Sequence, residues 1–214
     1  MELQVNEIFL SVQGESSFAG WPCVMVRLAG CSLGCAYCDT AYARTEPGEP
    51  MTVDEVLARV EAYTARHVEL TGGEPLDQPA ALPLLQRLCD SGRVVLLETS
   101  GALDIAGVDR RVHVIMDLKC PSSGMSHRVR WQNLDLLKET DEVKLVICDR
   151  ADYDWARQQI RRHGLTGRCT VLLSPAAGAV DPADLARWML DDGLDARLQL
   201  QLHKLIWPAN LRGV

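Results

Sequence analysis

Three cysteines stand close together in the chain, at positions 31, 35 and 38. Thiolates at this CxxxCxxC spacing can bind three irons of a four-iron four-sulfur cluster and leave the fourth iron without a protein ligand. Iron-sulfur electron carriers normally use four cysteines, so a compact triad with no obvious fourth partner predicts chemistry at the cluster itself.

Two other interpretations of the triad remain open at this point. A structural zinc site needs four ligands and usually reads as two separated ligand pairs, and the sequence holds no second CxxC or HxxxH. Buried cysteines can also serve as small apolar residues. The crowding of three cysteines between Cys31 and Cys38, flanked by Gly30 and Gly34 in a segment that is expected to be a loop, argues against this role.

A second segment, Thr-Gly-Gly-Glu-Pro at positions 71–75, follows the apolar run Val68–Leu70, which reads as the end of a buried strand. Glycines at a strand exit let the backbone approach a ligand closely, and Glu74 can accept a hydrogen bond from an amine. With the cysteine triad, the chain resembles the radical S-adenosylmethionine (SAM) enzymes, in which the open iron binds the amino and carboxylate groups of methionine.

Length and composition set the broad class of the protein. A chain of 214 residues with an ordinary apolar content is expected to form one domain over residues 1–214. A net charge of -7 without a basic run argues against direct nucleic-acid binding. Without a membrane-length apolar stretch or a signal peptide, we expect a cytoplasmic protein with reduced thiols. The remaining cysteines are then packing residues: Cys23, Cys89, Cys120, Cys148 and Cys169.

Apolar runs and helical patterns alternate along the chain and predict an α/β fold with parallel strands. The units are too few for a closed eight-stranded barrel, so we expect a partial, open β/α barrel with its ligands at the carboxyl ends of the strands. The predicted strands are Cys23–Leu28, His67–Leu70, Val94–Leu97, Val112–Met116, Val143–Ile147, Thr170–Leu173 and Leu198–Leu202. The predicted helices are Thr52–Ala65 with a Thr52/Glu55 capping box, Ala80–Cys89, Ala151–Arg162 and Asp181–Leu190. The segments expected at the shared rim are the cysteine loop, Gly72–Gly73, Glu98–Thr99 and Asp117–Lys119.

Further segments narrow the resemblance to one family, and they are spread from the N-terminal segment to the C-terminal tail, over essentially the whole chain. These are Asn6–Phe9, Val12–Glu15, Arg27–Leu28, Cys38–Thr40 and Leu202–Trp207. Together they resemble the 7-carboxy-7-deazaguanine synthases, a radical SAM family of the pathway to queuosine and related 7-deazapurines. Ser16 departs from the pattern, because many relatives have glycine after the Gln-Gly-Glu segment.

The resemblance implies a radical lyase. The implied substrate is 6-carboxy-5,6,7,8-tetrahydropterin. The pyrazine ring of this pterin contracts with loss of ammonia. One electron from the reduced cluster cleaves SAM to a radical that takes a hydrogen atom from carbon 6, and the hydrogen is later returned. The protein's task is to position both molecules and to exclude water.

The resemblance also implies roles for individual residues. Cys31, Cys35 and Cys38 are the cluster ligands. The other SAM-binding candidates are Tyr37, Asp39, Gly73, Glu74, Asp117, Lys119 and Ser174, although Asp117 and Lys119 would also suit a solvated loop pair. The substrate candidates are Val12, Gln13, Gly14, Glu15, Arg27 and Thr71.

For two further side chains, a ligand role must be weighed against a purely structural one. Thr40 is implied as a Mg²⁺ ligand that holds the substrate carboxylate, although threonine also commonly caps a turn. His203, between apolar residues on an expected strand, is more typical of a core side chain than of a ligand.

The family is typically homodimeric and takes its electron from a donor such as flavodoxin or ferredoxin. Within the same chemistry, a glycyl-radical activating enzyme shares CxxxCxxC but acts on a partner protein. A non-catalytic iron-sulfur or zinc protein is the alternative from another class.

Overall fold

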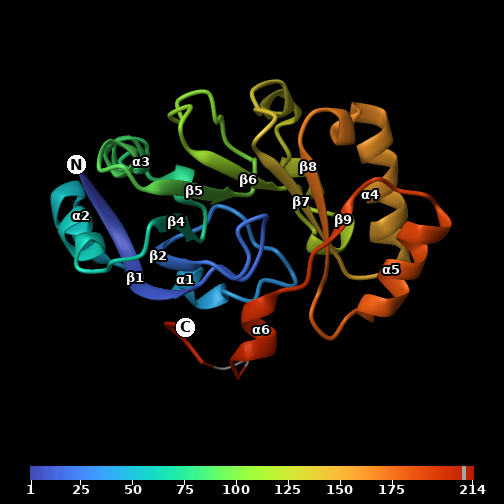
Figure 1. Cartoon of the computed structure of the whole chain (residues 1–214), viewed down its shortest axis with the longest axis horizontal. Coiled ribbons are helices and arrows are strands. Elements are labelled where there is room, and N and C mark those ends of the chain that lie inside the picture. The colour runs from blue at the N-terminus through green and yellow to red at the C-terminus, as the bar shows by residue number, and fades with distance from the viewer. Residues whose placement is uncertain (209–210) are drawn as a thin grey trace.

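A single mixed sheet forms the frame of the molecule in the computed structural model, which describes residues 1–208 and 211–214. Its order is β3-β1-β2-β4-β5-β6-β7-β8-β9, and Figure 1 shows it curving through the centre of the molecule. The strands are β1 (Glu2–Val12), β2 (Pro22–Leu28), β3 (Glu49–Thr52), β4 (His67–Gly72), β5 (Val94–Thr99), β6 (His113–Asp117), β7 (Glu142–Ile147), β8 (Thr170–Pro175) and β9 (Arg197–Leu198).

Strand direction confirms the predicted open architecture. From β2 to β9 every neighbouring pair is parallel, while β1 runs antiparallel to both β2 and β3. In the described residues, β3 and β9 are the two ends of the sheet order and do not pair with each other, so the barrel stays open. All carboxyl ends of the parallel strands therefore meet at one rim.

Helices connect the parallel strands and cover the outside of the sheet (Figure 1). The α-helices are α1 (Ala41–Thr45), α2 (Val53–Glu61), α3 (Ala81–Asp90), α4 (Arg150–His163), α5 (Pro182–Asp191) and α6 (Leu202–Ile206). Short 3₁₀ turns are η1 (Pro75–Asp77), η2 (Pro121–Ser123), η3 (Ser126–Arg128), η4 (Trp131–Asp135) and η5 (Leu165–Gly167). No helix in the described part of the chain combines the length and the apolarity needed to cross a bilayer.

Local sequence signals explain where two of these helices begin. Thr52 and Glu55 form the predicted reciprocal capping box at the start of α2, and Asp181 accepts a hydrogen bond from the Ala183 amide at the start of α5. Leu84, Leu85 and Leu88 of α3 are fully buried against the sheet, and such side chains make up the core.

The predicted strand Leu198–Leu202 is largely wrong. Only Leu198 lies in β9, and Leu202 already begins α6, so His203 is helical rather than on a strand. The alternating Leu-Gln pattern matches the period of a strand, but the Leu202 amide donates to the Gly14 carbonyl at 2.8 Å and draws the chain across the sheet. The strands β1 and β3 lie outside the runs that the apolar pattern predicts, because β1 mixes polar and apolar residues and β3 is short.

Candidate functional site

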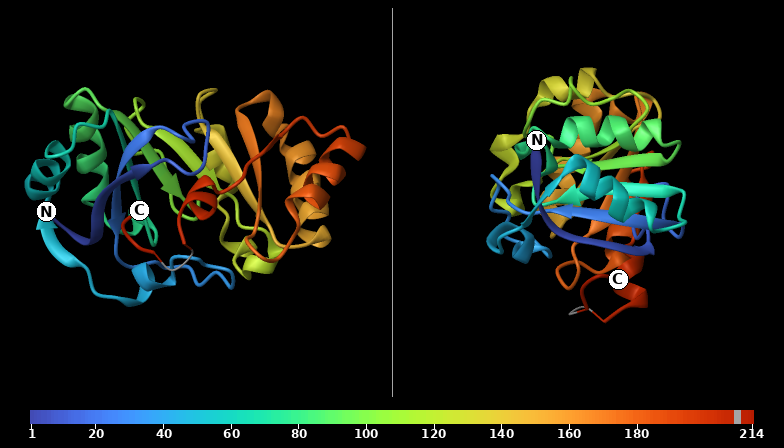
Figure 2. Two further views of the ribbon diagram at one scale, coloured as in Figure 1. Left: turned by 60° about the horizontal axis from the view of Figure 1, so that its bottom comes forward. Right: turned by 90° about the vertical axis from the view of Figure 1, so that its left-hand side faces the viewer.

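A cavity of about 340 Å³ lies at the carboxyl ends of the parallel strands, where the sequence predicts the site. The tail helix α6 lies in front of the sheet at this opening, as the left view of Figure 2 shows. The predicted site residues that line the cavity are Val12, Gln13, Gly14, Glu15, Arg27, Cys31, Cys35, Tyr37, Cys38, Asp39, Thr40, Thr71, Gly73, Asp117 and Lys119. Glu74 and Ser174 are not among its lining residues. A second, open hollow of about 790 Å³ is formed by α4 alone and contains none of the predicted residues.

The three cysteines of the triad lie on the loop between β2 and α1, on one wall of the cavity. All three are free thiols; Cys31 and Cys35 are half-buried and Cys38 is exposed. Burial raises the pKa of the Cys31 and Cys35 thiols. The loop is held in place by a hydrogen bond from the Ala36 amide to the Ser123 carbonyl at 3.0 Å.

This donor set fits a four-iron cluster with one open iron. In such a cluster each thiolate binds a different iron, so the three cysteines must surround the cluster rather than a single metal ion. In the described residues, no three His, Cys, Asp or Glu side chains gather around a single metal position.

Gly73, just after β4, packs directly against the cysteine loop. Its amide donates to the Leu28 carbonyl at 3.1 Å, and the Glu74 amide donates to the Gly30 carbonyl at 3.0 Å. A Cβ at position 73 would lie 1.9 Å from the Gly30 carbonyl oxygen and 2.7 Å from Cys31 Cβ. Glycine is therefore required here, because only a bare backbone can approach the cysteine loop this closely.

Glu74 is buried, and its carboxylate binds the protein rather than facing the cavity. One oxygen accepts from the Leu76 amide at 3.1 Å and the Thr99 hydroxyl at 2.8 Å. The other accepts from the Ser100 amide at 2.8 Å and the Ser100 hydroxyl at 2.5 Å. The carboxylate thus ties the end of β4 to the end of β5. A direct contact of Glu74 with SAM stays a prediction.

Asp117 is the last residue of β6 and Lys119 lies just after it, and the two are not a solvated pair. Asp117 is buried, and its Oδ2 accepts from Lys119 Nζ at 2.9 Å. Although burial alone would raise the pKa of Asp117, Lys119 and Lys144 hold it below its ordinary value. Its Oδ1 is buried and has no hydrogen-bond partner in the described residues. Ser174, at the end of β8, is buried with an unpartnered hydroxyl but does not line the cavity, so its role in SAM binding stays a prediction.

The loop after β1 forms another wall and is packed against the tail. The Gln13 side-chain NH₂ group donates to the Glu69 carboxyl, and the side-chain oxygen Oε1 of Gln13 accepts from the Glu15 backbone amide at 2.8 Å. A Cβ on Gly14 would lie 2.1 Å from His203 Nδ1, so glycine is needed for α6 to pack here. The loop and the tail therefore build this wall together.

Arg27 on β2 is paired beside Thr71 on β4, and both line the cavity. Arg27 Nε donates to Glu7 at 2.7 Å, and the Tyr42 hydroxyl donates to the same Glu7 oxygen at 2.7 Å. Burial disfavours the charged guanidinium, yet Tyr42 and Glu7 raise the pKa of Arg27 above its ordinary value. Of the Arg27 nitrogens, only Nε donates to Glu7 in the described residues. The two terminal guanidinium nitrogens of Arg27 have the planar geometry that suits a carboxylate.

Thr40 lies at the mouth of the cavity, where its hydroxyl donates to Asp39 at 3.0 Å. Thr40 is the N-cap residue of α1, but its side chain makes no capping hydrogen bond there, so its role as a Mg²⁺ ligand stays a prediction. Asp39 also pairs with Lys204 of α6 at 2.5 Å, which joins the cysteine loop to the tail.

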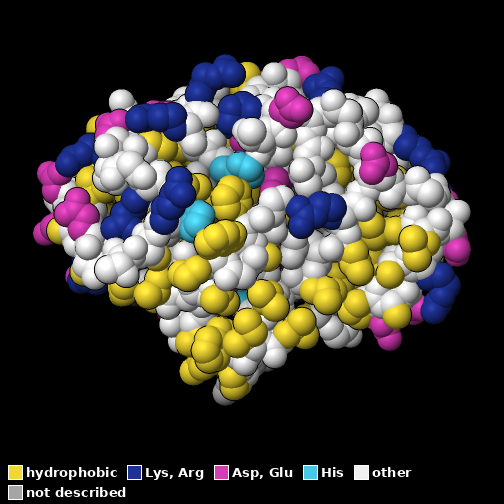
Figure 3. Space-filling model, in the orientation of Figure 1, with side chains coloured by type: hydrophobic (Ala, Val, Ile, Leu, Met, Phe, Trp, Pro, Cys, Tyr) yellow, Lys and Arg dark blue, Asp and Glu magenta, His cyan; other side chains and the backbone are white. Residues whose placement is uncertain are grey.

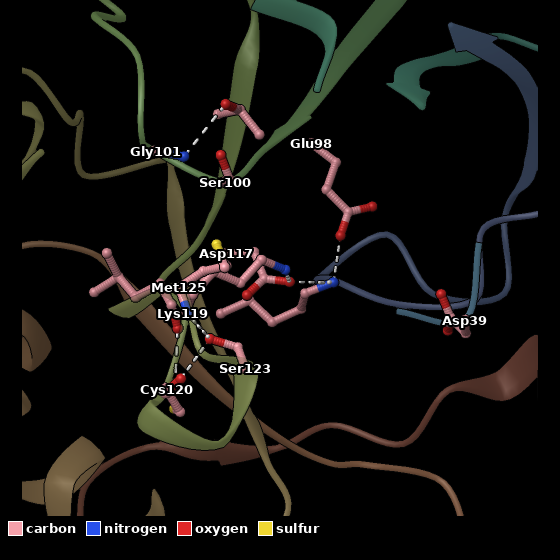
Figure 4. A network of polar contacts seen from close by, with 12 residues as sticks. Asp39, Glu98, Ser100, Gly101, Asp117, Lys119, Cys120, Ser123 and Met125 are labelled. Atoms are coloured by element: carbon pink, nitrogen blue, oxygen red, sulfur yellow. Dashed lines mark hydrogen bonds and ion pairs between the residues drawn. The ribbon is translucent and has the colours of Figure 1, made fainter. Parts of the chain in front are cut away.

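Several charged or polar lining residues were not predicted. Lys144, on β7, pairs with Glu15 at 2.5 Å, with Asp117 at 3.5 Å and also with Glu98 on β5. Figure 4 shows Glu98 and Asp117 pointing toward the same ammonium group. The signal for such residues is a lone charge inside an otherwise apolar strand, because a buried charge needs a partner or a ligand. Glu69 and Lys144 are of this kind, whereas Glu98 lies in a predicted rim segment but was given no role of its own. Gln201, His203 and Lys204 line the cavity from the tail and were also not predicted as site residues.

Replacement of Glu69 by glutamine is expected to stabilise the apoprotein in a pH-dependent way. Burial, followed by the nearby Glu98 and Glu15, raises the pKa of Glu69 well above its ordinary value. Folding therefore takes up a proton, and this contribution to stability is lost as pH rises from the unfolded pKa toward the folded one. The advantage of Glu69→Gln should grow by about 1.4 kcal/mol per pH unit in that window. Urea unfolding at several pH values measures it.

Glu142→Gln is the matched control for this experiment. Burial would raise the pKa of Glu142, but His113 and the Ser17 amide hold it below its ordinary value. The sign is then opposite: the wild-type carboxylate stabilises above its unfolded pKa, and the variant should lose stability there. Equal slopes for the two variants would contradict a neutral Glu69.

Comparisons with known proteins agree with this geometry. The family model described as the radical SAM superfamily matches residues 25–155. The chain is 53% identical to the 7-carboxy-7-deazaguanine synthase of Chlorobaculum tepidum over 99% of this chain and 97% of the relative. It is 46% identical to that of Koribacter versatilis over 99% of this chain and 100% of the relative.

Solved structures agree as well. The crystal structure of QueE from Escherichia coli superposes with a TM-score of 0.77 and 27% identity over 95% of each chain. Streptococcus suis SuiB, at 14% identity, TM-score 0.57 and coverage of 80% of this chain and 47% of SuiB, shares the fold alone. The full-length relatives, the matched family model and the cysteine-lined cavity show that this chain belongs to the 7-carboxy-7-deazaguanine synthase family of the radical SAM superfamily.

Proposed function

We propose that this chain converts 6-carboxy-5,6,7,8-tetrahydropterin into 7-carboxy-7-deazaguanine with loss of ammonia, as a radical SAM lyase of 7-deazapurine (queuosine) biosynthesis. One observation carries the proposal: a single cavity brings the cysteine triad, the Gly73 turn and the predicted substrate residues together. The cavity has room for small molecules, and its polar groups come from many different segments.

The cofactor side of the cavity is the wall made by the cysteine loop, Gly73 and the end of β6. Cys31, Cys35 and Cys38 would hold the cluster. The bare backbone of Gly73 and the unpartnered oxygen of Asp117 would receive polar groups of SAM. When bound, the cluster and SAM supply the one-electron chemistry that starts the ring contraction. The protein's own contribution is to hold both reactants at fixed positions and to keep water out.

The substrate side is the wall made by the loop after β1 together with β2 and β4. The terminal nitrogens of Arg27 would bind the pterin carboxylate, and Thr71 would hydrogen-bond beside it. Gln13 and Glu15 would face the ring. Thr40 would supply one oxygen to Mg²⁺, whose remaining positions suit water and the substrate carboxylate. The Thr40 hydroxyl is already oriented by Asp39, which supports this assignment.

Exposed apolar side chains on the tail support a homodimer. Figure 3 shows hydrophobic side chains gathered around α6 at the bottom of the molecule. The exposed large residues there include Leu205, Ile206, Trp207 and Leu211. A second copy of this chain covering them would also help to close the site. A cytoplasmic electron donor such as flavodoxin or ferredoxin would reach the cluster at the exposed Cys38. Residues 1–214 would act as one catalytic domain.

Arg27→Ala is expected to weaken substrate binding while leaving the cluster intact. Removal of a charge-assisted hydrogen bond to the carboxylate should raise KM for the pterin about 10- to 100-fold. Iron content and SAM binding should stay unchanged, because Arg27 is neither a proposed cluster ligand nor a proposed SAM contact. Steady-state kinetics with variable pterin measure the effect.

Arg59→Ala serves as the control, since Arg59 makes only an exposed ion pair with Glu49. Its KM should match the unmodified protein. An unchanged KM in Arg27→Ala would remove Arg27 from the substrate site.

The proposed function is tested by anaerobic reconstitution with iron and sulfide, followed by reductant, SAM, Mg²⁺ and 6-carboxytetrahydropterin. Mass spectrometry should detect 7-carboxy-7-deazaguanine, and omission of Mg²⁺ should slow its formation. Cleavage of SAM without this product would point to another substrate, and absence of both reactions in a cluster-loaded protein would reject the proposal.

A further inference from the structure

Lys144 is a buried lysine that has no role in the function proposed so far. It lies in the middle of β7, its side chain is 5% exposed, and it faces the cavity. Its ammonium group contacts three carboxylates, those of Glu15, Glu98 and Asp117. These come from the loop after β1, from β5 and from β6, so one cation joins three separate walls of the site.

The carboxylates around Lys144 would otherwise repel one another. Glu69 lies within electrostatic range of Glu15 and Glu98, and it already has a raised pKa. Lys119 pairs with Asp117, and His203 faces Glu15. Burial lowers the pKa of His203, so it adds little positive charge near neutral pH. Lys144 is therefore the main cation beside Glu15 and Glu98 in the described residues.

The contacts also fix which oxygens face the ligand. Both oxygens of Glu15 are engaged, one by Lys144 at 2.5 Å and one by the Gln201 amide at 2.6 Å. In the described residues only Oε1 of Glu98 has a hydrogen-bond partner, which is Lys144. Its side chain is 27% exposed and lines the cavity, so the other oxygen is open to a bound molecule.

We propose that Lys144 is a positioning residue that holds the carboxylates of Glu15 and Glu98 aimed at the N–H groups of the pterin ring. The inference rests on the proposed function. The amino-pyrimidine edge of a pterin presents hydrogen-bond donors, which need carboxylate acceptors rather than neutral acids. A neutral carboxyl group turns one of its oxygens into a donor and meets the ring with the wrong polarity. Lys144 prevents this at Glu15 by favouring the charged form, and its contact with Glu98 holds that carboxylate at the same place.

Lys144→Met tests the proposal, because it keeps the aliphatic stem and removes the charge. The probe is 6-carboxypterin, the oxidised and fluorescent analogue, titrated into reconstituted protein with SAM. Lys144 helps to hold the pKa of Glu15 below its ordinary value, so without the cation Glu15 is protonated at low pH and recovers its charge as pH increases. The ratio of variant to wild-type Kd should be about 10- to 100-fold near pH 6 and should shrink steadily toward pH 9. Using the ratio cancels titration of the probe itself.

Lys138→Met is the matched control, since Lys138 also pairs with a buried carboxylate, that of Asp141, but does not line the cavity. Its Kd ratio should stay near one at every pH. The double variant Lys144→Met/Glu98→Gln removes one negative charge with the cation and should flatten the pH dependence, which also keeps the test informative if the single variant folds poorly.

A pH-independent Kd ratio in Lys144→Met, or a ratio near one, would overturn the proposal. So would a double variant as steeply pH-dependent as the single one. These outcomes differ from failure of the proposed function, in which the unmodified protein would itself neither bind 6-carboxypterin nor convert the tetrahydropterin.

Discussion

Cys35→Ala is expected to abolish product formation and SAM cleavage together. Cys35 is the middle ligand of the triad and lines the cavity between Cys31 and Cys38. Loss of its thiolate leaves one more iron without a protein ligand, so the cluster should not survive reconstitution. The iron and sulfide content of the reconstituted protein, its visible absorption and the yield of 7-carboxy-7-deazaguanine measure the effect. We expect all three to fall to the level of protein that received no iron.

Cys148→Ala is the matched control for this experiment. Cys148 is a free, half-buried thiol that follows β7 and does not line the cavity. Its removal should leave iron content and activity near those of the unmodified protein. Full iron content in Cys35→Ala, or loss of iron in Cys148→Ala, would show that the cluster is held elsewhere.

Gly73→Ala is expected to have the second largest effect, although it adds a single methyl group. The new Cβ would overlap the Gly30 carbonyl and crowd Cys31, and both atoms belong to the cysteine loop. The loop must then move by an ångström or more. A displacement of this size in a catalytic constellation costs about 100-fold in rate. Activity at saturating SAM and pterin and the iron content after reconstitution are the measurements.

Gly167→Ala provides the comparison, because a Cβ at position 167 meets nothing within 4 Å. It tests whether an added methyl group by itself disturbs the fold, and we expect wild-type activity and stability. If Gly73→Ala also kept wild-type activity, the close approach of the β4 turn to the cysteine loop would not matter for catalysis.

The fold was predictable from sequence where one signal dominated. The apolar runs from β2 to β8 mark strands that are covered on both faces, and Thr52 with Glu55 marks a helix start by a purely local interaction. The segment near Leu202 was not predictable in the same way. Its conformation depends on a backbone hydrogen bond from Leu202 to Gly14. These residues are 188 positions apart, so no local sequence pattern can indicate the contact.

The site was predictable to a similar degree. The cysteine triad and Gly73 were found because metal binding and close backbone approach require those residue types at those spacings. The full-length relatives rule out the zinc-protein and glycyl-radical activating alternatives that the triad alone left open. Lys144 and Glu98 were missed as individual side chains. A charge in a strand can be recognised from sequence, but its partners on other strands emerge only when the sheet is assembled.

The place of α6 in the cavity wall also sets an order of events during synthesis. The cysteine loop, the β4 turn and the ends of the central strands all leave the ribosome before Gln201, His203 and Lys204, which complete the wall. Until the tail packs on Gly14, the nascent site is open on that side. The tail therefore packs last, and because Cys38 is exposed in the folded chain, iron and sulfide can still reach the cysteine loop afterwards.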